Sequence, residues 1–315
     1  MEYSQKKIYV IINPVSGTKS KKDVPEKITQ RFDQHEYDIH IFVTGYVGHA
    51  TEIAQKAVLK KVDYVIAVGG DGTVNEVAKV LVDTDVIFGI IPSGSGNGLA
   101  RELHIPLNIS KAIEILKENN VKRIDYGVAN GQIFFCTCGV GFDALISEKA
   151  LEKPSRGKLM YAQSIISSLL NFKPQKYKIT TSQGVYEDKA FLVTCANASQ
   201  YGNDAFIAPH ADIQDGKMNL AIVKPLSAVE VTQAAIQIFT KNIGNNAKLV
   251  EFITSDAVIE RESDGYMHLD GNAAYTDKRV EVKIVPKGLS VLVPATTPKK
   301  KIDPQAFLNS ITRWI

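Results

Sequence analysis

The chain has 315 residues, of which 44% are hydrophobic and 23% are charged, with a formal net charge of +3 at pH 7. This length and apolar content fit one large or two smaller domains with buried cores, and they exclude an intrinsically disordered chain. The mild excess of positive charge also argues against nucleic-acid binding.

Targeting and redox signals are weak. The N-terminus lacks an apolar segment suited to a secretion signal, and no run of about 18 apolar residues exists that could span a membrane. We therefore expect a cytoplasmic protein. Cys136, Cys138 and Cys195 are too few and too irregularly spaced for a disulfide framework, so we expect buried, reduced thiols. Cys136 and Cys138 would point the same way from one strand.

Short apolar runs alternate with helical patterns over residues 1–125. The runs are rich in β-branched residues and predict buried parallel strands, while the segments between them carry apolar residues at helical spacing. The predicted strands are residues 8–12, 37–43, 62–68 and 86–91, and the predicted helices are residues 49–59, 74–81 and 99–103. This alternation predicts a doubly wound α/β domain, in which ligands bind beyond the carboxyl ends of the strands.

Strands dominate over residues 126–294, where many Asn-Gly and Asp-Gly turns separate short apolar runs. The predicted strands are residues 132–138, 176–181, 190–196, 218–223, 257–260, 280–285 and 289–293. Two helices, residues 158–170 and 227–240, interrupt them. We therefore predict a β-rich second domain of the sandwich type.

The strongest local signal is Gly69-Gly70-Asp71-Gly72-Thr73, between a predicted strand and a predicted helix. Glycines let backbone N–H groups approach a phosphate, and the helix N-terminus adds partial positive charge. Asp71 is the one acid in this loop, so it suggests a metal contact or a proton acceptor near a transferred phosphate. The alternative is a simple glycine turn with an N-capping aspartate.

Three further small-residue loops follow the other predicted strands. They are Asn13-Pro14-Val15-Ser16-Gly17, the segment from Thr44 to Ala50, and Pro92-Ser93-Gly94-Ser95-Gly96-Asn97-Gly98. Because the carboxyl ends of parallel strands lie at one edge of a sheet, the four loops converge on one candidate phosphate site. Neither a P-loop nor a Gly-x-Gly-x-x-Gly fingerprint is present, so phosphate binding follows another scheme.

The order and spacing of three motifs carry a family resemblance. The motifs are Asn13-Pro14-x-Ser16-Gly17, Gly69-Gly70-Asp71-Gly72-Thr73-x-Asn75-Glu76 and Pro92-x-Gly94-Ser95-Gly96-Asn97-x-Leu99-Ala100-Arg101. They resemble the catalytic-domain motifs of the diacylglycerol kinase and sphingosine kinase superfamily. The resemblance continues through residues 139–144, 215–217 and 270–271, so it covers nearly the whole chain, and it looks closest to compact bacterial soluble lipid kinases.

The resemblance implies a fold, an activity and its cofactors. The first domain would be like that of NAD kinases and phosphofructokinases. The protein would transfer the γ-phosphate of ATP, with Mg²⁺, to a hydroxyl of a diacylglycerol-like or sphingoid-like lipid at the membrane surface, with a place in phospholipid biosynthesis. The sequence does not name the lipid, and it leaves a homodimer open.

The resemblance also implies site residues. Asp71 matches the essential acid of the family, Asp125 a further acid of the active site, and Asp215 a magnesium site in the second domain. The positions matched around the nucleotide are Asn13, Ser16, Gly17, Thr44, Gly69, Gly70, Gly72, Thr73, Glu76, Gly94, Ser95, Gly96 and Asn97. From the residues alone, Asp125 and Asp215 are also ordinary turn residues before a glycine-containing turn.

One position departs from the family pattern. The family usually has Asp-Gly-Glu near its end and counts that glutamate as catalytic, but this chain has Asp270-Gly271-Asn272. Asparagine cannot act as a base or as a strong magnesium ligand. We expect Asp270, two residues away on the same strand face, to supply the missing charge together with Asp125. The alternative is a catalytically degenerate lipid- or nucleotide-binding protein of the same fold.

The C-terminal residues 295–315 form a candidate amphipathic tail. A lysine cluster at residues 299–301 precedes a helical pattern whose apolar face consists of Phe307, Leu308, Ile311, Trp314 and Ile315. Such a helix either binds an anionic membrane or docks on the protein body or on a second copy. Short terminal helices usually dock, which favours packing against the first domain.

Overall fold

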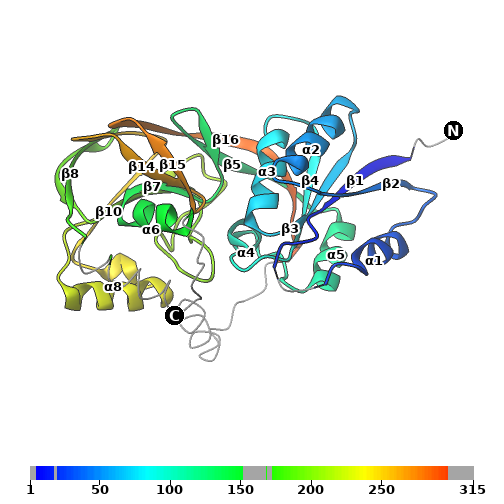
Figure 1. Cartoon of the computed structure of the whole chain (residues 1–315), viewed down its shortest axis with the longest axis horizontal. Coiled ribbons are helices and arrows are strands. Elements are labelled where there is room, and N and C mark those ends of the chain that lie inside the picture. The colour runs from blue at the N-terminus through cyan, green and yellow to red at the C-terminus, as the bar shows by residue number, and fades with distance from the viewer. Residues whose placement is uncertain (1–4, 18–19, 152–167, 169–171, 297–315) are drawn as a thin grey trace. The chain divides into compact units, whose positions relative to one another are not determined.

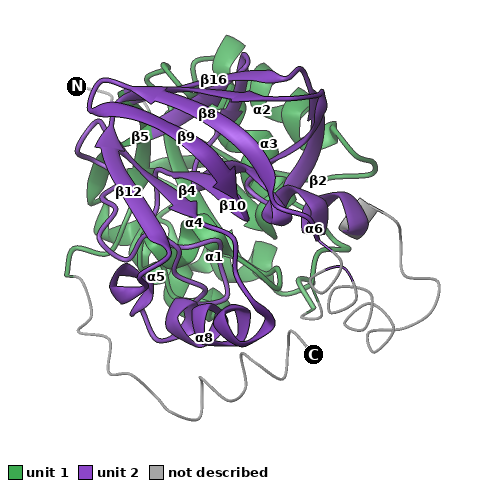
Figure 2. Cartoon of the chain, turned by 90° about the vertical axis from the view of Figure 1, so that its left-hand side faces the viewer, with its two compact units in different colours: residues 1–125, 286–299 green, residues 126–285, 300–315 purple. Residues whose placement is uncertain are grey.

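The computed structural model describes residues 5–17, 20–151, 168 and 172–296. The chain divides into two compact units, coloured separately in Figure 2. Of the described residues, those up to 125 and from 286 to 296 belong to the first unit, and those from 126 to 285 belong to the second. The segment after residue 285, which was predicted to end the second domain, thus lies with the first unit. It does so because Val291 pairs with Phe88 and the Val293 N–H donates to the Asn120 carbonyl at 2.9 Å.

The first unit is a parallel sheet between two layers of helices. Its strands, in the order β2-β1-β3-β4, are β1 (Lys6–Ile12), β2 (Tyr37–Val43), β3 (Tyr64–Gly69) and β4 (Ile87–Pro92). Its helices are α1 (Val24–Arg31), α2 (His49–Leu59), α3 (Asp71–Leu81), α4 (Gly98–Glu102) and α5 (Ile109–Glu118). Helices α2 and α3 cover one face and α1 and α5 the other (Figure 1). The predicted doubly wound α/β fold is confirmed.

Two helical details of this unit differ from the prediction. Helix α3 begins at Asp71 rather than at residue 74, because the Val74 N–H already donates to the Gly70 carbonyl at 3.0 Å. Asp71 therefore lies in the first turn of the helix, where a negative charge is stabilised by the helix dipole. Helices α1 and α5 were not predicted, although α5 buries Ala112 and Ile113 on its inner face.

The second unit is a sandwich of two sheets. One sheet is antiparallel in the order β12-β11-β10-β7-β14-β15, and the other contains β9-β8-β13-β16, with β5 beside β16 and β6 beside β5. The bounds are β5 (Val121–Ala129), β6 (Gln132–Phe134), β7 (Thr137–Gly141), β8 (Gln175–Thr181), β9 (Gly184–Ala190), β10 (Leu192–Ala196), β11 (Met218–Val223), β12 (Leu249–Thr254), β13 (Asp256–Arg261), β14 (Gly265–Leu269), β15 (Asn272–Thr276) and β16 (Arg279–Leu292). The helical segments are α6 (Phe142–Leu151), α8 (Ala228–Phe239) and the short η1 (Ile243–Asn245). The predicted β-sandwich is confirmed.

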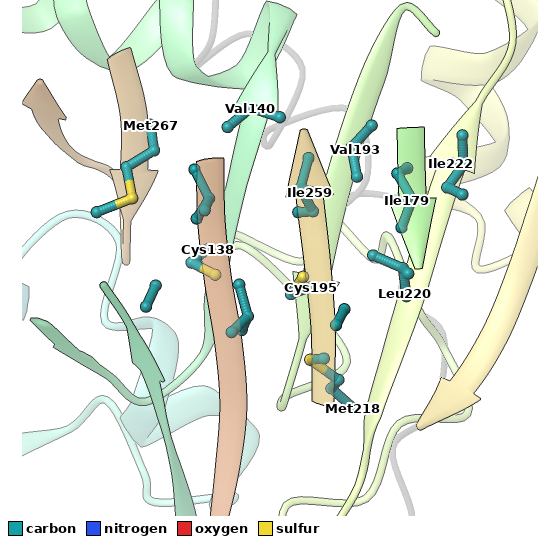
Figure 3. Packing of buried hydrophobic residues seen from close by; sticks show 14 of the residues in the cluster. Cys138, Val140, Ile179, Val193, Cys195, Met218, Leu220, Ile222, Ile259 and Met267 are labelled. Carbon is teal, nitrogen blue, oxygen red and sulfur yellow. The ribbon is translucent and has the colours of Figure 1, made fainter. Parts of the chain in front are cut away.

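The core of the sandwich lies between the two sheets. Figure 3 shows Ile179 and Ile259 from one sheet beside Val193 and Leu220 from the other. All three cysteines are buried and free, as expected. However, Cys138 lies opposite Cys195 on β10, and Cys136 is not on the same strand as Cys138.

In two places the predicted strands differ from the observed strands by more than a shift of one or two residues. The strand predicted at 132–138 is two strands, β6 and β7, because the N–H groups of Phe135 and Cys136 donate to a side chain instead of a neighbouring strand. The two strands predicted around the turn at 286–288 form the single strand β16. There the chain passes Lys287, at φ +55°, without reversing direction.

Residues 152–167, 169–171 and 297–315 lie outside the described residues. The predicted helix at 158–170 and the predicted tail with Trp314 therefore fall there, apart from isolated positions. Among the helices that are described, none has the length and apolar character needed to cross a bilayer.

Candidate active site

The loops after β1 and β4 touch each other at the carboxyl edge of the first unit's sheet. The Ser93 N–H donates to the Gly69 carbonyl at 2.8 Å, and the hydroxyl oxygens of Ser16 and Ser93 are 3.2 Å apart. Gly17 has φ +63°, and a Cβ there would lie 1.8 Å from the Ser93 carbonyl oxygen. Only glycine fits at position 17, so the loop after β1 is held directly against the loop after β4.

The Asp71 carboxylate joins the loops after β3 and β4. One oxygen accepts the N–H of Asn97 at 2.8 Å, and the other accepts the N–H of Gly98 at 2.6 Å. These N–H groups lie at the start of α4, so Asp71 caps α4 from the first turn of α3. An N-capping role was the predicted alternative for Asp71, but the helix that it caps is α4 and not its own helix α3. Each oxygen still has a second lone pair that could contact a ligand.

Asn97 closes the loop after β4. This residue is buried at φ +53°; its side-chain oxygen accepts the Gly94 N–H at 2.9 Å, and its amide donates to the Gly94 carbonyl at 2.7 Å. A Cβ at Gly94 would lie 2.5 Å from the Gly70 Cα, and one at Gly96 would lie 2.6 Å from an Asp71 oxygen. The glycines at 94 and 96 therefore let the two loops pack together.

Gly72 and Ser95 are the exposed residues of the loops after β3 and β4. A Cβ at Gly72 would meet no atom within 4 Å. Gly72 is thus not required by the packing of the protein itself. The close approach of a ligand to the backbone at the start of α3 would explain why this position is a glycine.

Asn13 and Thr73 meet beneath the same loops. The Asn13 amide donates to the Thr73 hydroxyl at 2.9 Å, and its carbonyl oxygen accepts the Val15 N–H at 3.1 Å. A Cβ at Gly69 would lie 2.5 Å from the Thr73 Cβ, which explains that glycine. Glu76 lies half-buried in the next turn of α3. The structure thus gathers most of the predicted nucleotide-binding residues at one edge.

The loop after β2 presents a flat aromatic pair. The Thr44 N–H donates to the Ile12 carbonyl at 2.9 Å, which continues the pairing with β1. The Gly45 N–H donates to Nδ1 of His49 at 3.1 Å, so the neutral ring carries its proton on Nε2. The Tyr46 ring stacks on His49 with a centroid distance of 4.5 Å, and Tyr46 is 59% exposed.

Two cationic side chains contact the carbonyl groups of these loops. The Lys21 ammonium donates to the Ser16 carbonyl, and the Arg101 guanidinium donates to the Gly96 carbonyl at 2.9 Å. Burial lowers the pKa of Lys21 from its ordinary value. Both cations add positive potential at the loops, which favours an anionic ligand.

Asp125 is fully buried in β5, so the alternative that it is a turn residue is wrong. Its carboxylate accepts the Lys287 N–H at 2.7 Å. This bond satisfies the backbone where β16 has its left-handed residue. Asp125 thus helps to hold the later part of β16, from residue 286 on, in the first unit.

Asp270 lies in a turn and not on the strand face that was predicted. Its φ is +50°, and with Gly271 it forms the two-residue turn between β14 and β15. Its carboxylate accepts the N–H groups of Phe135, Cys136 and Thr137 at 2.8, 2.7 and 3.1 Å. Asp270 is in the turn and Asn272 begins β15, so the two residues do not share a strand face. The reason for predicting that Asp270 replaces the missing charge at Asn272 is therefore wrong.

Asp215 is exposed, and its carboxylate accepts the Lys217 N–H at 2.9 Å, next to Gly216 at φ +73°. This is the geometry of an Asp-Gly turn. The described residues contain no group of three or more histidines, cysteines or acids that could hold a metal ion. The magnesium role of Asp215 stays a prediction.

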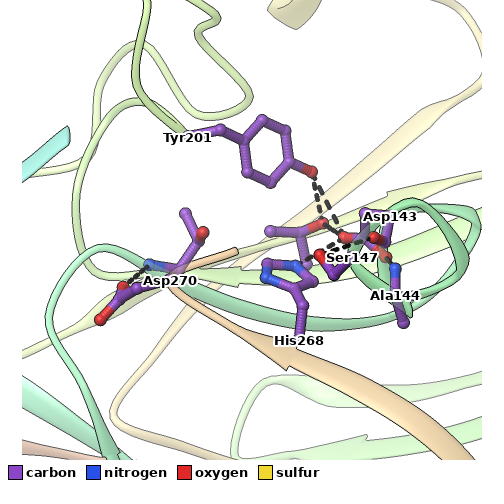
Figure 4. A network of polar contacts seen from close by, with 8 residues as sticks. Asp143, Ala144, Ser147, Tyr201, His268 and Asp270 are labelled. Atoms are coloured by element: carbon purple, nitrogen blue, oxygen red, sulfur yellow. Dashed lines mark hydrogen bonds and ion pairs between the residues drawn. The ribbon is translucent and has the colours of Figure 1, made fainter. Parts of the chain in front are cut away.

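A polar network that sequence reasoning missed lies on the outer face of the six-stranded sheet (Figure 4). His268, Gly139 and Thr194 lie in register across β14, β7 and β10. Because Gly139 has no side chain, the Asp143 carboxylate from α6 occupies the space between the other two. A Cβ at Gly139 would lie 2.7 Å from an Asp143 oxygen and 2.9 Å from the His268 Nε2.

The Asp143 carboxylate is well satisfied. One oxygen accepts the Thr194 hydroxyl at 2.7 Å and lies 2.9 Å from His268 Nε2 and 3.4 Å from the Tyr201 hydroxyl. The other accepts the Ala144 N–H at 2.8 Å. Burial raises the pKa of Tyr201 well above its usual range, and the Asp143 charge adds to this.

An apolar cluster borders this network. Phe142, Phe172 and Phe191 make mutual ring contacts with centroid distances of 4.8 to 5.4 Å. Tyr201 packs against the same cluster, so it joins the polar and apolar regions. The sequence signal was the segment at residues 139–144, which carried part of the family resemblance and to which no role had been given.

Comparisons with known proteins agree with this architecture. Residues 7–129 match the family model described as diacylglycerol kinase catalytic domain, and residues 136–293 match the YegS C-terminal NAD kinase beta sandwich-like domain. A diacylglycerol kinase from Bacillus subtilis (strain 168) is 29% identical over 276 residues, covering 84% of this chain and 89% of that protein.

Solved structures give the same picture. A diacylglycerol kinase from Bacillus anthracis str. Sterne superposes with a TM-score of 0.72 at 25% identity, covering 93% of this chain and 98% of the other. An NAD kinase from Archaeoglobus fulgidus in complex with ATP gives a TM-score of 0.51 at 11% identity, covering 98% and 99% of the two chains. The second likeness shows the fold alone.

Gly72 gives a test of phosphate approach that does not disturb the protein. Gly72→Val should leave the free energy of unfolding nearly unchanged, since the site has open space, while ATP affinity falls at least about tenfold because the branched side chain blocks the backbone. Calorimetric titration and urea denaturation measure the two effects. Gly244→Val, at another open glycine, is the control. Unchanged ATP affinity in folded Gly72→Val would contradict the assignment.

Asp71→Asn should weaken both the loops and the reaction. The amide would face a backbone N–H, so we expect a loss of about 1–3 kcal/mol of stability. We also expect turnover to fall about 100-fold or more, the scale for a positioned acid–base group. Asp63→Asn is the control, because the Asp63 carboxylate accepts the Lys7 N–H at 2.7 Å at the amino ends of β1 and β3, opposite to these loops. Near-normal turnover in Asp71→Asn would exclude a catalytic role.

Removal of the buried carboxylate in the polar network should be costly. Asp143→Ala leaves His268, Thr194 and Tyr201 without their shared acceptor, and we expect a loss of about 3 kcal/mol or more in urea denaturation. Thr194→Ser keeps a hydroxyl at the same place and should stay within about 1 kcal/mol of the wild type. Equal stability of the two variants would show that the network contributes little.

Proposed function

This chain belongs to the kinase family defined by the diacylglycerol kinase catalytic domain, and we propose that it transfers the γ-phosphate of ATP to a hydroxyl group of a lipid. The observation that carries the proposal is the interlocking of three small-residue loops at the carboxyl ends of β1, β3 and β4. Their exposed positions lie beside the N-terminus of α3, where backbone N–H groups favour a phosphate.

In this proposal the triphosphate lies over the loops after β3 and β4, and the base lies toward β2. Strand β2 is two strands away from β3, which corresponds to about 10 Å across the sheet. That separation suits the length of an extended nucleotide. The exposed Tyr46 ring, stacked on His49, offers a flat face for a base.

Mg²⁺ is part of the proposal because phosphoryl transfer needs charge neutralisation. The ion commonly uses one or two carboxylates together with phosphate oxygens, so it needs no preformed cluster of acids. Asp71 is the acid that lies at the loops, and each of its oxygens keeps a lone pair. The residues present therefore fit an ion that arrives with the nucleotide.

The lipid acceptor is supported by the names of relatives and by the second unit. Relatives from Bacillus subtilis and Mycobacterium tuberculosis are named diacylglycerol kinase. The Asp143 network, next to the aromatic cluster around Phe142 and Phe191, combines polar and apolar groups. Polar and apolar side chains placed side by side suit a molecule with a hydroxyl end and a hydrocarbon chain. We propose that the acceptor is diacylglycerol-like or sphingoid-like and is met at a membrane surface.

Catalysis would then depend mainly on position. A loose phosphoryl-transfer transition state requires alignment and charge stabilisation more than covalent chemistry. The bonds that Asp71 makes to the loop after β4 hold it in a fixed orientation. From there its remaining lone pairs would orient the acceptor hydroxyl or accept its proton.

Asn272 favours a second candidate function, a catalytically degenerate lipid- or nucleotide-binding protein. This side chain is exposed and uncharged at the position where the family usually has glutamate.

An assay with labelled ATP and a lipid panel in mixed micelles, with products identified by mass spectrometry, separates the two. We expect wild type to phosphorylate at least one lipid and Asn272→Glu to change its turnover by less than about tenfold, since positioning dominates this chemistry. Asp71→Asn serves as the impaired control. If wild type is inactive on every lipid and Asn272→Glu restores turnover, the protein is a catalytically degenerate binding protein.

A further inference from the structure

Helix α8 has an exposed face without charge. Val229 is 80% exposed and Ile236 is 52% exposed. They are seven residues apart, so they lie on the same side of the helix, and the exposed Thr232 and Gln233 lie between them. The Thr232 hydroxyl donates to the Ala228 carbonyl at 3.3 Å, so its hydrogen bond is made within the helix. We call Val229, Thr232, Gln233 and Ile236 the α8 face.

The opposite side of α8 is already used for packing. Ala234 is buried, and Ile238 packs against the apolar cluster that contains Phe191. The Phe206 N–H donates to the Ile238 carbonyl at 3.0 Å, which fixes the end of the helix. A surface helix usually has one apolar side and one charged side, but α8 has apolar residues on both. The α8 face is therefore not explained by the core.

The start of the helix is also capped by its own side chains. Ser227 and Glu230 form a capping box, in which the Ser227 N–H donates to the Glu230 carboxylate at 2.8 Å. Glu230 also lies 3.5 Å from the Lys248 ammonium. It is the one charged residue among the twelve of α8, and these bonds engage it at the start of the helix. The α8 face is thus presented by a well-formed helix without an acid on that side.

Positive charge lies at both ends of helix α8. Lys224 precedes the helix, Lys241 and Lys248 follow it, and Glu230 is the one acid between residues 224 and 248. The Lys241 ammonium lies 4.1 Å from the centroid of the Phe206 ring, which places it at the end of α8. Lysines beside exposed aliphatic side chains complement the phosphate groups and the acyl region of an anionic bilayer.

We propose that the α8 face, with Lys224 and Lys241, is the surface by which this protein binds an anionic membrane. This inference rests on the proposed function, because a lipid acceptor must be reached at an interface. A two-fold dimer through the same helix is disfavoured, since it would bring the lysines of one copy toward those of its partner. Two aliphatic side chains and two lysines predict weak, reversible binding that high salt reduces.

Vesicle co-sedimentation tests the surface directly. Wild type should bind vesicles of phosphatidylcholine mixed with phosphatidylglycerol and should bind pure phosphatidylcholine less well. The Val229→Glu/Ile236→Glu variant should bind the mixed vesicles at least about tenfold less, since acids repel the anionic surface and remove the apolar contact. Lys224→Gln/Lys241→Gln should lose the preference for phosphatidylglycerol. Val185→Glu is the matched control, because Val185 is 59% exposed on β9 of the same unit.

Activity and oligomer measurements separate the remaining outcomes. Val229→Glu/Ile236→Glu should phosphorylate a short-chain, water-soluble lipid like wild type, but a vesicle-embedded lipid more slowly. Light scattering should show the same oligomeric state for both. Normal vesicle binding by this variant, or a change in its oligomeric state, would overturn the membrane assignment. Failure of wild type to phosphorylate any lipid would instead refute the proposed function, while vesicle binding would still test the surface.

Discussion

The carboxyl edge of the first unit's sheet depends on a single carboxylate. Asp71 binds two N–H groups of another loop, at the shared start of α3 and α4. A negative charge between two helix N-termini is stabilised by both dipoles, so the loops are ordered before any ligand arrives. The same charge would repel a nucleotide if nothing offset it. Lys21 and Arg101, which bind carbonyls of these loops, supply that compensation.

In the second unit, the alternation of side chains along each strand puts apolar groups on one face of the sheet and polar groups on the other. Along β14, Met267 and Leu269 face the core, while His268 between them faces the opposite side. The same period places Thr194 on the outer face of β10, beside the Asp143 carboxylate. A buried carboxylate is costly unless it is fully hydrogen-bonded, and here donors from four residues surround it. Because the core stays apolar, this polar region does not weaken the packing between the sheets.

The regular elements followed from the sequence because their periods are local. Strand 37–43 and helix 49–59 were predicted with the bounds that β2 and α2 have. The convergence of glycine loops also followed, from the rule for parallel sheets. The contacts of Asp71 did not, because its partners are 26 and 27 residues away. Likewise, the role of Gly139 becomes clear only when three strands are in register, and Asp270 was misplaced because an Asp-Gly turn can also be read as strand.

The paired thiols of the sandwich have a consequence for chemical durability. Cys138 lies opposite Cys195 in the core, and burial, with the hydrogen bond between the two, raises the pKa of Cys138 well above its usual range. Because the thiolate is the form that attacks oxidants and alkylating reagents, this sulfur is inert in the native fold. Chemical modification of the Cys138 thiol therefore requires that the two sheets of the sandwich first separate. The rate at which a thiol reagent labels Cys138 therefore measures how often the sandwich opens, and no cysteine has to be introduced for this measurement.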